Sequence, residues 1–256
     1  MKKTTIIFFF FQICFVLNLL AQKNVPYKAG EYCSYTLSYG IIKAAYAEYE
    51  IQDITTLNNK TAYHIIAKGR TASFFDLFFK VRDRYETYIN TETLEPLFFI
   101  RDVNEGGYII KEQYIFNHKL GTVESKKTNY PITKNTQDMV SAFFFARTLE
   151  KEKVLKDSMF TVTMFLDEEL YNLEVKYLYN ENIETKWGKI NCMVFMPKMQ
   201  KGRIFQHEEK MKLWITDDKN HLLFKVEAEI WAGTIKAELN NFRGLKYPIR
   251  RKKKDK

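Results

Sequence analysis

The 256-residue chain is poor in cysteine, histidine and glycine, and each shortage excludes a class of protein. It has three cysteines, four scattered histidines and ten glycines. So few cysteines cannot build a disulfide scaffold or a zinc site, and no His-Glu-x-x-His pattern is present. The glycines form no phosphate-binding loop, no dinucleotide fingerprint and no Gly-x-Ser-x-Gly elbow. We therefore predict no metal, no cofactor and no catalytic residue, and expect a protein that is not an enzyme.

The body of the chain has little net positive charge, although the formal net charge of the whole chain is +9. Lys2 and Lys3 supply two of these charges, and Arg250–Lys256 has six basic residues against one acidic residue. A nucleic-acid-binding protein usually spreads basic side chains over a folded face, so we predict no nucleic-acid partner. We expect residues 246–256 to form a disordered basic tail. The alternative is an electrostatic tether to an anionic envelope surface, either lipid or polysaccharide.

Only the N-terminus carries a long apolar run. Two lysines precede the segment Ile6–Leu20, and Ala21 offers a small residue for cleavage. This layout is typical of a secretory signal peptide, which we place at residues 1–21. A retained anchor is the alternative, although the run has roughly 15 residues against the ~20 of a spanning helix. Cys14 lies inside the run, which argues against a lipid-modified cysteine. We expect an exported protein, soluble or peripheral, in the periplasm or at the outer face of the envelope.

The rest of the chain alternates apolar and polar residues over short stretches that are separated by turns. In Gly30–Tyr39, Cys33, Tyr35 and Leu37 fall on one side of a period-two pattern, which predicts a half-buried strand. Roughly ten to twelve such strands occur with almost no helical crossovers, so their pairing should be antiparallel. The fold class is therefore mainly β: one domain over residues 22–245 with an antiparallel, strongly curved sheet or barrel.

One short helix is predicted at about residues 137–149. Thr136 is a suitable N-cap, and Asp138 adds negative charge to the first turn. Apolar side chains recur at helical spacing, namely Met139, Val140, Phe143, Phe144, Ala146 and Leu149. We expect this face to pack on the sheet rather than to form a groove for a partner.

Two cysteines, Cys33 and Cys192, follow the predicted signal peptide, and both lie on the apolar side of strand-like alternations. An exported protein can form disulfides, but a free cysteine also behaves as a small core residue. We predict two buried free thiols, and a single disulfide is the alternative.

Aromatic residues are abundant, with 21 Phe and 16 Tyr. They are densest in Phe74–Arg101, which we interpret as two strands joined by a polar turn at Asn90–Thr93, with Pro96 at the start of the returning strand. Consecutive phenylalanines in a strand point to opposite faces. One member of each pair is therefore covered by the helix and loops, or it lines a cavity. The cavity interpretation gives the candidate ligand-binding residues Phe75, Phe79, Tyr85, Phe99 and Trp214.

Several short motifs resemble, in their order and spacing, those of one family. They are Gly30-Glu31-Tyr32-Cys33-Ser34-Tyr35, Tyr39-Gly40, Asp83–Ile89, Leu94-Glu95-Pro96, Trp187-Gly188 and Trp214–Asp218. Together they make residues 27–239 similar to the exported bacterial family catalogued as domain of unknown function 3108. One departure is the lack of a glycine near Ala44-Ala45. The family has no assigned activity, so the resemblance implies fold and export rather than chemistry. The hairpins also resemble those of periplasmic lipoprotein carriers with open, lipid-holding β-barrels.

Export, β-architecture and surplus aromatics favour a non-enzymatic cell-envelope protein that binds a lipid or another apolar or amphipathic ligand in a β-barrel or half-barrel. The alternative is a structural or assembly factor that acts through protein or polysaccharide contacts. A hydrolase with a dispersed site is the third hypothesis. Asp217-Asp218 could supply paired carboxylates for it, but a polar turn explains these residues better.

Overall fold

The computed structural model describes residues 24–198, 211–230 and 233–252, most of which build one sheet. In chain order the elements are β1 (Tyr32–Tyr39), β2 (Ile42–Leu57), β3 (Lys60–Thr71), the 3-10 helix η1 (Phe75–Leu77), β4 (Val81–Asn90), β5 (Pro96–Glu105), β6 (Tyr108–Asn117), β7 (Thr122–Glu124), β8 (Asn129–Pro131), α2 (Met139–Arg147), α3 (Lys151–Asp157), β9 (Met159–Leu166), β10 (Glu169–Thr185), β11 (Gly188–Lys198), β12 (Met211–Thr216), β13 (Leu223–Ile230), β14 (Gly233–Arg243) and β15 (Arg251–Lys252). The predicted signal peptide, residues 1–21, lies outside the described residues. Among the described helices, none is long and apolar enough to cross a bilayer.

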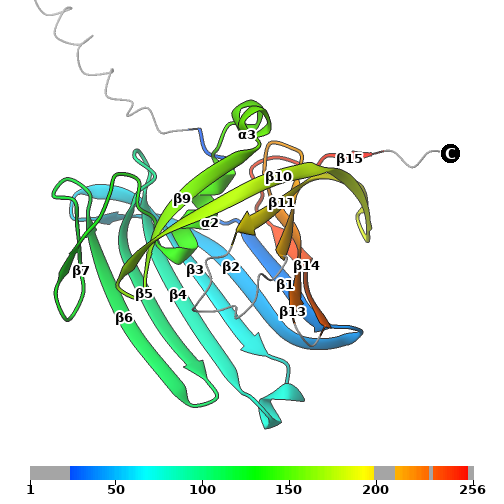
Figure 1. The fold of residues 1–256 in the computed structure, drawn as a ribbon, viewed down its shortest axis with the longest axis horizontal. Coiled ribbons are helices and arrows are strands. Elements are labelled where there is room, and N and C mark those ends of the chain that lie inside the picture. The colour runs from blue at the N-terminus through cyan, green and yellow to red at the C-terminus, as the bar shows by residue number, and fades with distance from the viewer. Residues whose placement is uncertain (1–23, 199–210, 231–232, 253–256) are drawn as a thin grey trace, which may run out of the picture.

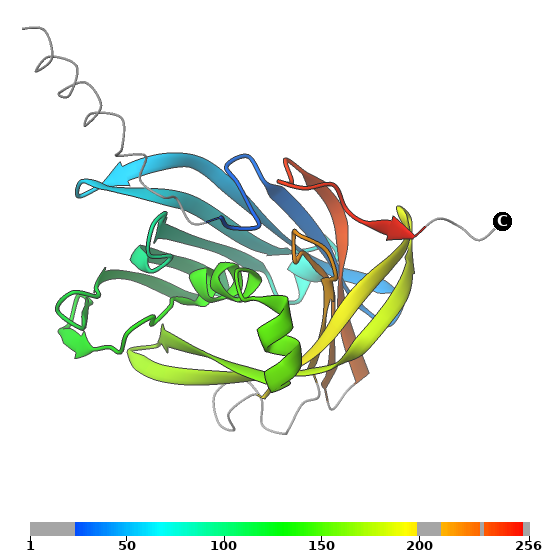
Figure 2. The ribbon, with the colours of Figure 1, turned by 90° about the horizontal axis from the view of Figure 1, so that it is seen from above.

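Strands that are neighbours in the sheet are mostly neighbours in the sequence. From β8 at one edge the order runs back to β1, continues through β14 and returns to β9 at the other edge, with β15 paired to β11. The pairing of β1 with β14 aligns Cys33 with Phe242, so the first strand in the sequence lies beside one of the last. The sheet curls around the helices (Figure 1, Figure 2). The predicted antiparallel, strongly curved sheet is confirmed. Within the described residues its edge strands β8 and β9 do not pair, so the curl is not a closed barrel.

The predicted helix is confirmed as α2, which lies inside the curl (Figure 2). It is shorter than predicted at both ends, and its N-cap is Asp138 rather than Thr136. Gln137 is extended because it is bonded to the edge of β9. Its N–H donates to the carbonyl of Thr163, and its own carbonyl accepts from the N–H of Phe165, each over 2.8 Å.

The second helix, α3, has no counterpart in the sequence prediction. Among its seven residues only Val154 is buried, so the segment shows no apolar stripe at helical spacing. The helix ends at Ser158, whose φ of 56° lies in the left-handed region.

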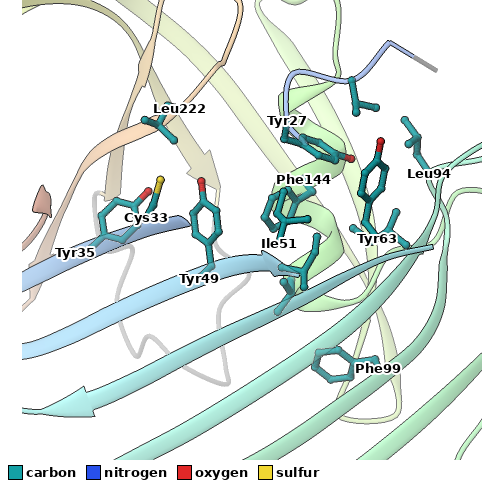
Figure 3. Close-up of a cluster of buried hydrophobic side chains, with 14 of the residues drawn as sticks. Tyr27, Cys33, Tyr35, Tyr49, Ile51, Tyr63, Leu94, Phe99, Phe144 and Leu222 are labelled. Atoms are coloured by element: carbon teal, nitrogen blue, oxygen red, sulfur yellow. The ribbon is translucent and has the colours of Figure 1, made fainter. Parts of the chain in front are cut away.

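Aromatic and aliphatic side chains together form the main core between the sheet and α2 (Figure 3). The ring of Tyr27 meets Tyr63 and Phe144 edge-on, at centroid distances of 5.4 and 5.1 Å. Tyr49 meets the same Phe144 edge-on at 5.3 Å. Such pairs add about 0.5–1.5 kcal/mol each to the benefit of burying their area. Phe144 therefore packs α2 directly against β2 and, through Tyr27, against β3, as expected of a core-facing stripe.

The two cysteines are both buried and free, which confirms that prediction. Burial raises the pKa of the Cys33 thiol and of the Cys192 thiol to about 12. Both thiols therefore stay protonated at neutral pH and behave as small core side chains.

The hairpin predicted in Phe74–Arg101 is present as β4 and β5, with Pro96 at the first position of β5 and the turn at Asn90–Thr93 between the strands. Phe74–Phe79, by contrast, belongs to no strand and forms the connection that contains η1. Here two consecutive N–H groups bond to the carbonyl of Ala72, so the chain coils instead of extending. The argument that consecutive phenylalanines point to opposite faces of a strand therefore applies only to Phe98 and Phe99 in β5.

The first part of the predicted basic tail packs on the domain. The Lys246 ammonium donates to the carbonyl of Val25 over 2.7 Å, and the N–H of Tyr247 donates to Asn220 Oδ1 over 3.0 Å. The chain then pairs with β11 as β15. The fold therefore continues past the predicted boundary at residue 245, as far as residue 252.

Candidate ligand-binding cavity

The N-terminus of α2 is fixed by the buried side chain of Asp138. Its carboxylate accepts the N–H groups of Val140 and Ser141, each over 2.8 Å, and the hydroxyl of Thr87 on β4 over 2.5 Å. The Ser141 hydroxyl accepts the N–H of Asp138 in return, which completes a capping box. Burial raises the pKa of Asp138 to about 6, although the hydrogen bonds from Thr87 and Ser141 oppose the shift.

The C-terminus of α2 is fixed by Arg147, which forms a buried bidentate ion pair with Glu31. The Nη1–Oε1 distance is 2.6 Å, and the Nη2–Oε2 distance is 3.2 Å. Tyr49 donates its hydroxyl to the same carboxylate over 2.9 Å, and Arg147 Nε donates to the carbonyl of Asn220 over 3.1 Å. Buried charges are tolerated when they are paired and hydrogen-bonded. This network ties the helix to β2 and to the turn before β13.

With both ends fixed, one face of α2 lines a cavity of about 370 Å³. The cavity lies between α2, α3 and strands β9–β13. Its apolar lining consists of Met139, Ala142, Phe143, Ala146, Leu149, Val154, Phe160, Val162, Met164, Leu173, Val175, Met193, Phe195, Pro197, Met211, Leu213, Ile215 and Leu223. The alanines on α2 leave space that the facing strands do not fill. The volume is within the range of about 300–1,000 Å³ that small-molecule sites occupy.

The polar side chains Arg147, Lys151 and His221 border the apolar cavity, and each is already engaged. Arg147 is paired with Glu31, Lys151 forms an ion pair with Asp217, and His221 Nδ1 contacts the carbonyl of Arg147 at 2.8 Å. The same three side chains border a polar hollow of about 480 Å³. Its other charged lining residues are Glu150, Glu152, Asp217, Asp218, Lys219 and Arg250. An apolar chamber and a charged hollow therefore lie side by side, with these three side chains between them.

Residues 34–240 match the family model described as Protein of unknown function (DUF3108). The chain belongs to the DUF3108 family. The description carries no activity, and no curated protein sequence matches the chain.

Among solved structures, this DUF3108 chain is similar to a β-barrel-like protein of domain of unknown function DUF1849 from Brucella abortus. The TM-score is 0.55 at 8% identity, over 85% of this chain and 98% of the other. A candidate exported protein with a YmcC-like fold from Bacteroides fragilis and a candidate lipoprotein from Parabacteroides distasonis each give a TM-score of 0.37 at 10% identity. They cover 86% of this chain and 98% and 97% of their own. The Brucella likeness shows the fold alone, and the other two are too distant to carry an argument.

In this DUF3108 fold the five ligand-binding residues predicted from the sequence lie outside the cavity lining, at three places. Tyr85 and Phe99 are neighbours on β4 and β5, with stacked rings 6.4 Å apart. Trp214 is buried in β12 and donates its indole N–H to a glutamate of β10 over 2.7 Å. Phe75 and Phe79 belong to the η1 connection, where Phe79 is 54% exposed. A ligand role for these five residues stays a prediction.

The residues that do line the cavity come from segments whose patterns predicted only secondary structure. Met139, Phe143 and Ala146 belong to the helical stripe, and the alternation through Phe160–Leu166 predicts a strand. Nothing in either pattern shows that the stripe and the strand face each other across an open space. Elsewhere in the described part of the chain, no group of three or more His, Cys, Asp or Glu side chains is placed to hold a metal ion.

Proposed function

We propose that the protein is a non-enzymatic cell-envelope protein that binds an amphipathic lipid, with the acyl chain in the cavity between α2 and β9–β13. The observation that carries the proposal is the lining, which is apolar except for three side chains at one border. A chamber of this kind gains free energy by excluding water from an apolar ligand, by about 25 cal/mol for each Å² of apolar surface buried.

The charged hollow beside the cavity supports an amphipathic ligand rather than a purely apolar one. Arg147, Lys151 and His221 line both spaces, so the head group of a molecule in the cavity would lie beside charged side chains. Its acyl chain would lie against Phe143 and Phe195, and its polar head group would lie near Lys151 and Lys219. These contacts orient a bound molecule and need no chemical step.

The predicted signal peptide at residues 1–21 supports an envelope location. We propose that the exported protein is either free in that compartment or peripheral to a membrane.

The direct experiment is native mass spectrometry of the protein purified without detergent from an expressing bacterium, followed by extraction of any bound lipid. A second measurement is the affinity for a fluorescent fatty acid, cis-parinaric acid. Ala146→Phe should fill the chamber and lower that affinity about tenfold or more. Ala29→Phe, at another half-buried alanine outside the lining, is the matched control.

Three results would count against the proposal: a clean apo mass, no affinity for the fatty acid, or equal affinity in Ala146→Phe and the wild type. If no ligand binds and crosslinking in cells captures envelope proteins or polysaccharide instead, the structural or assembly role takes its place.

A further inference from the structure

We propose that the rim of the sheet formed by the β1–β2, β3–β4 and β5–β6 turns docks on the surface of an anionic lipid bilayer. We define the rim as residues 38–45, 68–84 and 102–111. It lies at the lower end of the sheet in Figure 1. The inference concerns a surface separate from the cavity, and it holds whether or not the cavity takes a ligand.

Exposed apolar side chains gather on this rim. Of the fifteen large exposed apolar side chains in the described residues, nine belong to it. They are Tyr39, Ile41, Ile42, Phe74, Leu77, Phe78, Phe79, Tyr108 and Ile109. Leu77 is 81% exposed and Phe78 is 75% exposed. Single exposed apolar residues are common, but a cluster of this kind marks a site of contact with a partner or a membrane.

The η1 connection holds its apolar side chains outward by its own hydrogen bonds. Arg82 binds both carboxylate oxygens of Asp76, and the hydroxyl of Thr71 donates to the same carboxylate. The N–H of Val81 in turn donates to the Thr71 hydroxyl oxygen over 3.0 Å. None of the residues of η1 is buried. The connection is therefore a defined projection, and Phe78 beside it does not fold back onto the sheet.

Hydrogen bonds and packing join the three turns into one continuous edge. The N–H of Ala72 donates to the carbonyl of Ala44, which connects η1 with the β1–β2 turn. On the other side, the N–H of Gly106 donates to the carbonyl of Lys80 over 2.8 Å. The Phe79 ring lies directly over Gly106, where a Cβ would be only 2.4 Å from it. Since paired strands are about 4.8 Å apart, the turns form a row rather than isolated tips.

The charge of the rim is complementary to anionic lipid. The rim holds seven basic side chains and four acidic ones. The rim has a net charge of +3, whereas residues 22–249 as a whole have a net charge of +2. The residues of 22–249 outside the rim are therefore slightly negative in net charge. Along the chain, the basic members nearest to the projecting phenylalanines are Arg70, Lys80, Arg82 and Arg84. Each basic residue near an anionic bilayer contributes about 1 kcal/mol.

A bilayer fits this arrangement better than a protein groove does. The apolar side chains project from a row of turns, flanked by basic ones, so they can enter the interface of a broad surface together. Phenylalanine and leucine beside lysine and arginine are the side chains that interfacial membrane segments use. A protein partner or a second copy of this chain would need a complementary concave surface, and both are outcomes of the test.

The test is flotation of the protein, as processed by an expressing bacterium, with phosphatidylcholine vesicles that contain or lack phosphatidylglycerol. Binding should require phosphatidylglycerol and weaken with salt. Leu77→Asp and Phe78→Asp should each lower binding about tenfold or more, because each replaces an inserted apolar side chain by a charge. Leu120→Asp is the matched control, since Leu120 is 72% exposed in the turn at the opposite end of β6.

All variants keep the basic tail, so a difference in vesicle binding between Leu77→Asp and Leu120→Asp is due to the rim. Urea unfolding midpoints equal to that of the wild type show that both variants fold. Equal binding by the two variants, or no vesicle binding by the wild type, overturns the inference. A wild-type dimer that Leu77→Asp converts to a monomer overturns it as well and makes the rim an interface between copies. Unchanged cis-parinaric acid affinity in Leu77→Asp keeps the rim separate from the proposed cavity function.

Discussion

Arg147 and Glu31 are 116 positions apart in the sequence, yet their side chains form a bidentate ion pair from which solvent is almost wholly excluded. The pair joins the end of α2 to the segment before β1. It thereby helps to set where the helix lies inside the curled sheet, beside the cavity.

Removing one partner of this pair should destabilise the protein strongly. Arg147→Met leaves the Glu31 carboxylate buried without its counter-charge, so we expect a loss of about 3–5 kcal/mol in the free energy of unfolding. Urea denaturation measures it. Lys198→Met is the control, because Lys198 forms an exposed pair with Glu174, and it should cost less than about 1 kcal/mol. A small effect of Arg147→Met would show that the pair does not fix the helix.

The capping residue Asp138 should make stability depend on pH. Burial raises its pKa to about 6 from the usual 3.8, so the folded state binds the proton more tightly than the unfolded state. The associated stability is present below about pH 4 and is lost as the pH rises through 6, up to about 3 kcal/mol in total. Asp138→Asn keeps an acceptor at the N-cap. Urea unfolding between pH 4 and 7 should therefore show a smaller loss of stability in this variant, and parallel curves would contradict the prediction.

The two thiols should be unreactive in the folded protein. Cys33 and Cys192 are buried, and burial raises both pKa values to about 12. The thiolate is the reactive form, so Ellman's reagent at pH 8 should label neither cysteine until guanidinium unfolds the chain, and then both. Rapid labelling without denaturant would show that one thiol is accessible. An absence of labelling after unfolding would show a disulfide.

Alanine substitutions at the two adjacent glycines of the β5–β6 turn distinguish the effect of backbone strain from the effect of packing against Phe79. Both have positive φ, 60° at Gly106 and 93° at Gly107, so alanine costs roughly 1–2 kcal/mol at either position. Only Gly106→Ala also places a Cβ against the Phe79 ring. We expect it to displace that ring and to weaken vesicle binding, whereas Gly107→Ala meets nothing within 4 Å and should not. Equal vesicle binding by the two variants would show that the position of Phe79 is unimportant for docking.

Particular residues show where sequence reasoning succeeded and where it stopped. The alternation of apolar and polar residues in Gly30–Tyr39 predicts β1, because successive side chains of a strand point to opposite faces and only one face is buried. The stripe containing Phe143 and Phe144 predicts α2 in the same way, from helical spacing. The aromatic density of Phe74–Phe79 predicts part of a hairpin, but bonds to Ala72 and the contacts of Asp76 coil it into an exposed connection. Of the five predicted ligand residues, Phe99 and Trp214 are buried, Phe79 is exposed, and none lines the cavity.

Local patterns are enough to predict the alternating strands, the antiparallel sheet, the position of one helix and the burial of both cysteines, because each depends on the order of neighbouring residues. The folded chain is needed to show that α2 lies across an apolar cavity from β9–β13, and that three turns align their exposed apolar side chains along one edge. Those arrangements depend on contacts between distant segments, such as Arg147 with Glu31 and Gly106 with Lys80, whose partners no local pattern specifies.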